Sequence, residues 1–316
     1  MSFLSEYTVV DIAYQHPWVP STLKLLARRA YEHADPAHGL DHVYRVLENI
    51  VRFNRDRPLS ALRRLLLACI ALMHDARDHK TLQQDPTRAD LLLSDIQIVI
   101  GLNNIIMEFL DENPGALALP RLSKDDDVDD DNDDNDYPVD CIFIVELITK
   151  VIETSSWSKR FHPESMMPLE WLMQYPAGVR REFFWLRNQL RAADMWDAIG
   201  HIGIRRCEQV SIVRTARRNQ RLESSYRVDD AEVVDDVCLH IAEKLLSLSK
   251  AMTPELRSLA EADDGPNSVL RTYLDTNAGS RLEELHKLLE HNCKRELLYS
   301  EARGAVERAI IGPPSL

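Results

Sequence analysis

Residues 65–80 read LLLACIALMHDARDHK. The apolar run 65–73 ends abruptly in His74 and Asp75, and two more polar residues of the same kinds follow at Asp78 and His79. Such a run is fit for a protein core, where a polar group costs several kcal/mol unless it finds a partner. The partner of His74 and Asp75 is therefore a neighbouring side chain, a solvent channel or a metal ion. Other features of the sequence are needed to choose among these three.

The composition favours a helical protein with a sizeable core. Of the 316 residues, 45% are hydrophobic, and only 10 are Gly and 15 are Pro. Long helices can therefore run without interruption, and a turn-rich β fold is disfavoured. The formal net charge of −13 argues against nucleic-acid binding by bulk electrostatics.

Cysteine usage and hydropathy indicate an intracellular protein. The five cysteines are scattered, odd in number and without a CxxC pair, which argues against a disulfide framework and a structural zinc site. The N-terminal residues lack the pattern of a signal peptide, and no apolar run reaches the roughly 18–20 residues of a membrane span. We expect a cytoplasmic protein that binds no membrane. The sequence leaves its oligomeric state open.

Apolar residues recur at helical spacing through most of the chain. Helices are expected at 21–34, 38–53, 60–76, 94–112, 141–153, 181–210 (one or two helices), 229–252 and 280–310. Ser21 follows Pro20 and is expected to cap the first helix. The β-branched segment 141–153 is a strand by propensity alone, but no second strand signal lies nearby to pair with it, so a buried helix is predicted. The pattern predicts an all-α fold in a single domain over 1–316.

An acidic segment interrupts this helical pattern. Residues 124–136 read KDDDVDDDNDDND, with nine Asp and one Lys. Such a block repels itself and buries nothing, so we expect a disordered surface insertion over 121–138. A specific calcium site would need a turn glycine and spaced oxygens, and this run has no glycine.

Histidines and carboxylates recur at separate places in the expected helices. His38 and His42 are four residues apart and share a helix face. His74 and Asp75 end the third helix, and Asp194 follows much later among apolar neighbours. Imidazole and carboxylate together suit a borderline-hard divalent ion. We expect Mn²⁺ first, then Fe²⁺, Co²⁺, Ni²⁺ or Zn²⁺, with Mg²⁺ less suited.

Four stretches of the chain resemble the conserved blocks of a known superfamily. They are HGLDHVYRV (38–46), ALMHDARDHK (71–80), AADMWDAIGHIGIRRC (192–207) and HIAEKLLSLSKAM (240–252). In this order they resemble the HD-domain metal-dependent phosphohydrolases, named for an adjacent His-Asp pair in the order H…HD…D. The resemblance is closest to the bacterial YedJ/YpgQ-like branch, with blocks HxxxHxxRV, HDxxDxK and DADRLDAIGAIGIAR. It spans about residues 25–285 and implies an HD-domain helical bundle with a core over about 20–285 and a C-terminal helical extension over 280–312.

The resemblance also implies roles for individual residues. The implied metal ligands are His42, His74, Asp75 and Asp194. His42 is preferred to His38 because it lies three residues before Arg45. Asp75 and Asp78 are implied as catalytic groups that accept a proton from water. Lys80 and His38 are implied to bind substrate by offsetting phosphate charge.

The implied activity is metal-dependent hydrolysis of a phosphate ester or anhydride, with a nucleotide as the substrate. Release of pyrophosphate from a nucleoside triphosphate and removal of a single phosphate both stay open. A second hypothesis is a catalytically weak HD-fold module that binds a nucleotide or a partner protein and regulates. Departures in the third block give it weight, because Ala192, Met195 and His201 stand where the branch has Asp, Arg and Ala.

Overall fold

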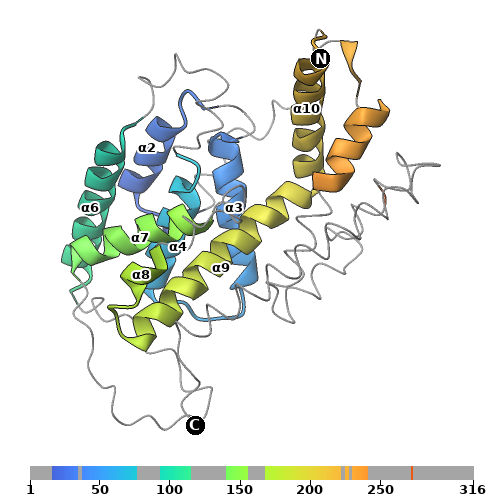
Figure 1. Ribbon diagram of the computed structural model, residues 1–316. Coiled ribbons are helices and arrows are strands. Elements are labelled where there is room, and N and C mark those ends of the chain that lie inside the picture. The colour runs from blue at the N-terminus through green and yellow to red at the C-terminus, as the bar shows by residue number, and fades with distance from the viewer. Residues whose placement is uncertain are drawn as a thin grey trace, which may run out of the picture. The chain divides into compact units, whose positions relative to one another are not determined.

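The chain folds into α-helices (Figure 1). The computed structural model describes residues 16–34, 38–76, 93–114, 140–155, 168–221, 225–227, 230–240 and 272. No strand occurs among these residues, so the prediction of an all-α protein is confirmed. The acidic insertion 121–138, the C-terminal extension 280–312 and the candidate residues Asp78 and Lys80 lie outside the described residues.

The chain divides into two compact units. The first comprises Met1–Arg191 with Arg308–Leu316, and the second comprises Ala192–Glu307. The helix α9 (Ala177–Ile199) is continuous across the division. A division that one unbroken helix crosses does not by itself separate independently folding domains. The single domain over 1–316 therefore stays a prediction.

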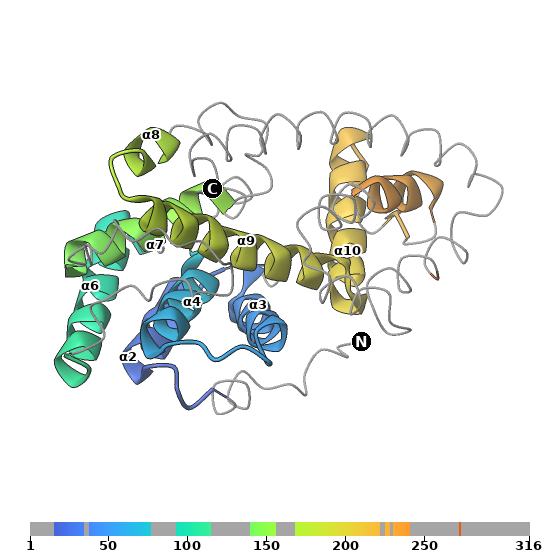
Figure 2. The ribbon, with the colours of Figure 1, turned by 90° about the horizontal axis from the view of Figure 1, so that it is seen from below.

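Helix α4 (Ala61–Met73) is the central element of the first unit. Its residues from Leu65 to Met73 are all buried, which is the property of a helix that is apolar all round. Three helices of the first unit pack closely against it, and Figure 2 shows them around it. They are α2 (Ser21–Ala30), α3 (Leu40–Phe53) and α7 (Cys141–Ser155). Helix α6 (Asp95–Glu112) packs on α2 and α7, and the short α8 (Pro168–Leu172) precedes α9.

Polar caps define where two of these helices begin. The Ser60 hydroxyl accepts a hydrogen bond from the backbone N–H of Arg63 at 3.2 Å, which caps α4. Ser94 and Gln97 form a capping box at the start of α6. The predicted cap of α2 was wrong, because Ser21 is its first helical residue and Pro20 occupies the cap position without a side-chain bond. Proline fixes the backbone before the helix and so moves the start by one residue.

The segment at 141–153 is a helix, as predicted against its β-branched composition. Phe143, Ile144, Leu147, Ile148 and Val151 are at most 6% exposed. Their spacing of three and four residues places them on one face of α7, where burial against α4 and α6 overrides strand propensity.

In α3 most of the apolar residues at helical spacing lie on one buried face. Val43, Val46, Leu47 and Ile50 are buried, whereas Val51 is 39% exposed. Val51 is displaced by about 100° around the helix from its buried neighbour Ile50. His42 is buried on the opposite side of this face from Val51, whereas Tyr44, seven residues before Val51, is buried on the same side as Val51.

The second unit contains the end of α9, helix α10 (His201–Arg218) and a helix at 231–240. The predicted region 181–210 thus forms two helices, which part at Gly200. At Gly203 a side chain cannot fit, because an added Cβ would lie 2.2 Å from the Asp197 carbonyl oxygen. This close approach of backbones requires glycine and sets the bend between α9 and α10.

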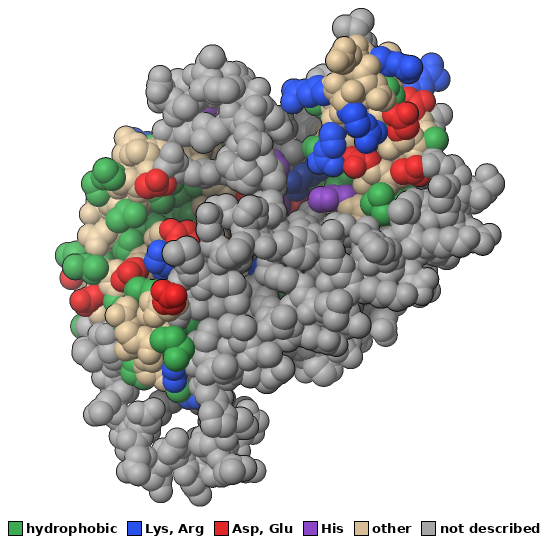
Figure 3. All heavy atoms as spheres, viewed as in Figure 1, with side chains coloured by type: hydrophobic (Ala, Val, Ile, Leu, Met, Phe, Trp, Pro, Cys, Tyr) green, Lys and Arg blue, Asp and Glu red, His purple; other side chains and the backbone are tan. Residues whose placement is uncertain are grey.

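Ion pairs join the helices of the second unit. Arg206 Nη1 lies 2.9 Å from Asp197 Oδ2, and Asp236 Oδ2 accepts from the Ser211 hydroxyl at 2.6 Å and from Arg214 at 3.0 Å. Arginine side chains (blue) gather on the surface over α10 (Figure 3). The basic character of α10 is thus partly offset by the acidic helix that follows it.

Among the described residues, no helix combines the length and the apolarity needed to cross a membrane.

Candidate metal centre

A helical hairpin carries the candidate site. Helix α3 begins at Leu40 and α4 ends at Met73, and residues 54–60 join the two packed helices. A connection this short makes neighbouring helices antiparallel, so the start of α3 and the end of α4 lie at the same end of the hairpin. Residues that are 32 positions apart in the sequence, His42 and His74, therefore meet in space.

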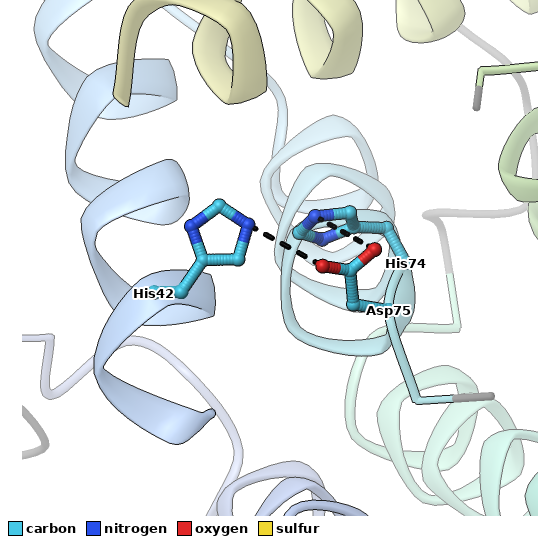
Figure 4. Close-up of side chains that lie close together, drawn as sticks. All are labelled: His42, His74 and Asp75. Carbon is cyan, nitrogen blue, oxygen red and sulfur yellow. Dashed lines mark ion pairs between the residues drawn. The ribbon is translucent and has the colours of Figure 1, made fainter. Parts of the chain in front are cut away.

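His42, His74 and Asp75 form one cluster (Figure 4). His42 Nε2 lies 3.5 Å from Asp75 Oδ2, and His74 Nε2 lies 3.6 Å from Asp75 Oδ1. One ligand atom from each residue can be chosen so that all lie within 4.8 Å of one another. Ligand atoms on one ion with bonds near 2.1 Å are at most about 4.2 Å apart, so small side-chain rotations suffice for all three to bind the same ion.

The cluster is withdrawn from solvent but still open to it on one side. The side chains of His42, His74 and Asp75 are 2%, 7% and 16% exposed. His42 lies on the buried face of α3 among apolar residues, where an imidazole needs a polar partner. The graded exposure leaves Asp75 as the member of the cluster that a small molecule reaches first.

The orientation of His74 is fixed by the end of its own helix. His74 is the C-cap of α4, and its Nδ1 lies 2.8 Å from the Ala71 carbonyl oxygen. A carbonyl oxygen only accepts, so Nδ1 carries the hydrogen and donates it. In the neutral ring the lone pair then lies on Nε2, the nitrogen that faces Asp75. A hydrogen bond of this kind, from the ring nitrogen that does not bind metal, is typical of metal-ligating histidines.

Asp75 is held from both sides. Its carboxylate Oδ2 lies 2.8 Å from His38 Nδ1, and its backbone N–H donates to the Tyr31 hydroxyl at 3.2 Å. Tyr31 directly follows α2, so three elements of the first unit converge on this residue. No sequence pattern pointed to Tyr31, which lies 44 positions away and carries no ligand chemistry of its own.

The surrounding imidazoles keep Asp75 ionised. Burial by itself raises the pKa of the Asp75 carboxyl, but the charge of His74 and hydrogen bonds from His38 and His42 outweigh it. The pKa therefore lies well below its usual value. Asp75 is an anion over the whole physiological pH range, which is the form that a cation requires.

The helix dipoles do not decide the charge preference of this site. The C-terminus of α4 presents partial negative charge, whereas the N-terminus of α3 presents partial positive charge. His42 lies in the first turn of α3 and His74 ends α4, so the two contributions oppose each other. The side chains alone set the chemistry of the cluster: two imidazole nitrogens and one carboxylate, a donor set that suits Mn²⁺, Fe²⁺, Co²⁺, Ni²⁺ or Zn²⁺.

The structure thus brings together three of the four predicted metal ligands and places His38 beside them. The fourth, Asp194, lies on α9 in the second unit, and its role as a ligand stays a prediction. The roles predicted for Asp78 and Lys80 likewise stay predictions.

Comparisons with known proteins gave no relative: no family model matches the chain, and no match was found among curated proteins or among solved structures.

Proposed function

We propose that the protein is a metal-dependent phosphohydrolase of the HD type, acting on a phosphate ester or anhydride, with a nucleotide as substrate. The observation that carries the proposal is the meeting of His42, His74 and Asp75 at one end of the α3–α4 hairpin. The same three residues are the ligands implied by the order H…HD in the sequence, so chain order and geometry point to one chemistry.

Each residue of the cluster would bind the cation through a specific atom. His42 and His74 would bind the cation through Nε2, and Asp75 would bind it through its carboxylate. A bound divalent ion supplies charge that polarises a phosphoryl group and lowers the pKa of a water molecule. In hydrolysis the water oxygen forms a bond to phosphorus, the bond from phosphorus to the leaving oxygen breaks, and that oxygen takes up a proton.

Proton transfer is assigned to carboxylates near the cluster. Asp75 enters the reaction ionised, because its pKa is held well below the usual value. Its carboxylate would accept a proton from the water and pass it to the leaving oxygen. Asp78 is the second candidate acceptor, and Lys80 is the candidate cation for the phosphates.

A regulatory module that binds a nucleotide or a partner protein is the second candidate function. Ala192 and Met195 are 3% and 5% exposed, so they contribute to packing where the resembled branch has charged residues. A chain that has lost such polar groups could retain ligand binding and lose turnover.

A metal analysis followed by an activity screen tests the proposal. Purified full-length protein is analysed for bound metal by mass spectrometry, and Mn²⁺ binding is followed as a rise in the melting temperature. At 100 times Kd, binding stabilises the folded state by about 2.7 kcal/mol. Wild type should bind Mn²⁺ and release phosphate or pyrophosphate from a nucleotide panel, and His42→Ala and Asp75→Ala should lose both properties.

Controls separate the two candidate functions. His33 is exposed, so His33→Ala removes an imidazole outside the cluster and should retain metal binding and activity. Asp194→Ala tests the remaining predicted ligand. Nucleotide binding without hydrolysis under every metal tried would favour the regulatory module, and activity retained in Asp75→Ala would refute the proposed mechanism.

A further inference from the structure

His38 lies at the edge of the cluster, one helical turn before His42. It precedes Gly39, the N-cap of α3, and its side chain is 18% exposed. The sequence alone implied that it binds substrate. In the structure its Nδ1 is 2.8 Å from Asp75 Oδ2, the shortest distance between any imidazole nitrogen of this group and that carboxylate.

The hydrogen-bond chemistry fixes the direction of this contact. An ionised carboxylate only accepts, so His38 Nδ1 carries the hydrogen and donates it to Oδ2. A hydrogen bond to a carboxylate at this distance is among the stronger hydrogen bonds in proteins. His42 Nε2 lies farther from the same oxygen, at 3.5 Å, so its hydrogen bond to Asp75 is weaker than that of His38.

The two carboxylate oxygens of Asp75 are therefore not equivalent. Oδ2 accepts from His38, whereas Oδ1 is the oxygen nearest His74 Nε2, at 3.6 Å. Asp75 follows the C-cap of α4, where the carboxylate could turn about its side-chain bonds if nothing held it. The His38 bond restricts that rotation and directs Oδ1 toward the imidazole nitrogen of His74.

We propose that His38 is a positioning residue of the metal centre, which holds Asp75 by Oδ2 and presents Oδ1, with the Nε2 atoms of His42 and His74, to one divalent cation. The proposal rests on the metal-binding part of the proposed function and not on hydrolysis. It assigns His38 an effect on cation affinity, where the sequence implied an effect on substrate binding. Partners that orient a ligand in this way typically contribute 10- to 100-fold to metal affinity.

Titration of full-length protein with Mn²⁺ in a calorimeter measures the effect directly. Loss of the donor in His38→Ala should weaken Mn²⁺ binding about 10- to 100-fold. His38→Asn should recover most of that affinity, because its side-chain amide nitrogen can take the place of Nδ1 and donate to Oδ2. The matched control His33→Ala removes an exposed histidine and should bind Mn²⁺ as wild type does.

Three results would overturn the proposal. Wild-type affinity in His38→Ala, with a raised KM for the nucleotide, would mean that His38 contacts substrate. Equal weakness of His38→Asn and His38→Ala would mean that the imidazole itself is required, as for a ligand. No binding of any divalent ion to wild type would remove the metal centre and this inference with it.

A measurement without metal keeps the inference testable if a variant is poorly folded. The nitrogen chemical shifts of His38 in apo wild type should identify the tautomer with hydrogen on Nδ1. In Asp75→Ala that preference should disappear, whereas the shifts of His33 should not change. A His38 ring with hydrogen on Nε2 in apo wild type would contradict the proposed bond. Cation binding without any hydrolysis would refute the hydrolase and leave the role of His38 standing.

Discussion

Asp75 has an imidazole nitrogen near each oxygen of its carboxylate and a tyrosine hydroxyl at its backbone N–H. Part of this network is formed before a cation arrives, because Oδ2 already accepts a hydrogen bond from His38. A prearranged set of donors loses little conformational entropy on binding, which favours affinity. The arrangement therefore has the properties of a site that is built in advance of its ligand.

His16 should make stability depend on pH in the weakly acidic range. Its side chain is 7% exposed, and its Nε2 has no hydrogen-bond partner among the described residues. Burial, and to a lesser extent the charge of Lys24, lowers the pKa of His16 below 6.5. Above pH 6.5 His16 is neutral in both states, and its contribution to the free energy of unfolding is present. As pH falls below 6.5 that contribution is lost, because the unfolded chain binds more protons than the folded one.

Urea unfolding of wild type and His16→Gln between pH 5 and pH 8 measures this contribution. The difference between the two free energies of unfolding should shrink as pH falls below about 6.5. A difference that stays constant with pH would show that His16 is ionised equally in both states. His33→Gln, at an exposed site, should give parallel curves.

Cys69 should be inert in the folded protein. It is fully buried in α4, and burial raises the pKa of its thiol from 9.0 to about 12. The thiolate is the reactive form, so alkylation at pH 8 should modify Cys69 only in unfolded chains. Mass spectrometry after iodoacetamide treatment, with and without denaturant, tests this. Rapid labelling of native Cys69 would contradict the packing of α4.

Among the helices, α4 and α9 are joined by a buried ion pair. Arg63 Nε lies 3.0 Å from Glu182 Oε1, and Arg63 Nη2 lies 2.6 Å from Oε2, a bidentate geometry. The guanidinium also lies 4.9 Å from the centre of the Trp185 ring. Both partners lie in the first unit, and Glu182 is 2% exposed.

Removing Arg63 alone from this ion pair should lower the free energy of unfolding substantially. Arg63→Ala leaves the Glu182 carboxylate buried without its partner, which should lower the free energy of unfolding by about 3–5 kcal/mol. Chemical denaturation measures the change. Lys150→Ala, which removes the exposed pair with Glu153, is the matched control and should cost about 0.5 kcal/mol or less. Equal losses in the two variants would show that the burial of Glu182 contributes nothing.

Helical periodicity predicted most elements because it is a local property. The predicted 38–53, 60–76 and 94–112 differ from α3, α4 and α6 by three residues at most at either end. The sequence left one or two helices open over 181–210, because the break at Gly200 depends on two backbones in contact at Gly203. The pair of Arg63 and Glu182 joins residues 119 positions apart, and no local pattern encodes such a contact.

For the molecule as a whole, heat should unfold the chain in a single transition. Helix α9 buries Phe183 and Leu190 in the first unit and Trp196 and Ile199 in the second. Because residues of this one helix are buried in both units, unfolding of either unit should destabilise the other. Scanning calorimetry should therefore give one peak whose van't Hoff and calorimetric enthalpies agree. Two separated peaks would contradict the single domain predicted from the sequence.

The candidate site was predicted as far as chain order allows. The resemblance to the order H…HD…D implied that His42, His74 and Asp75 share a site, and the short connection of the α3–α4 hairpin brings them together. Tyr31 and the Ala71 carbonyl could not be predicted, because their contribution depends on how α2 and the last turn of α4 approach Asp75.

The loop that joins the two helices of the hairpin lies far from the His42, His74 and Asp75 cluster. Residues 54–60 lie at the far end of α3 from His42, about 20 Å away for a helix of 14 residues. A chain severed after Arg55 would leave His42 on one fragment and His74 and Asp75 on the other. Capture of a cation by such a mixture would then report that the two pieces had reassembled.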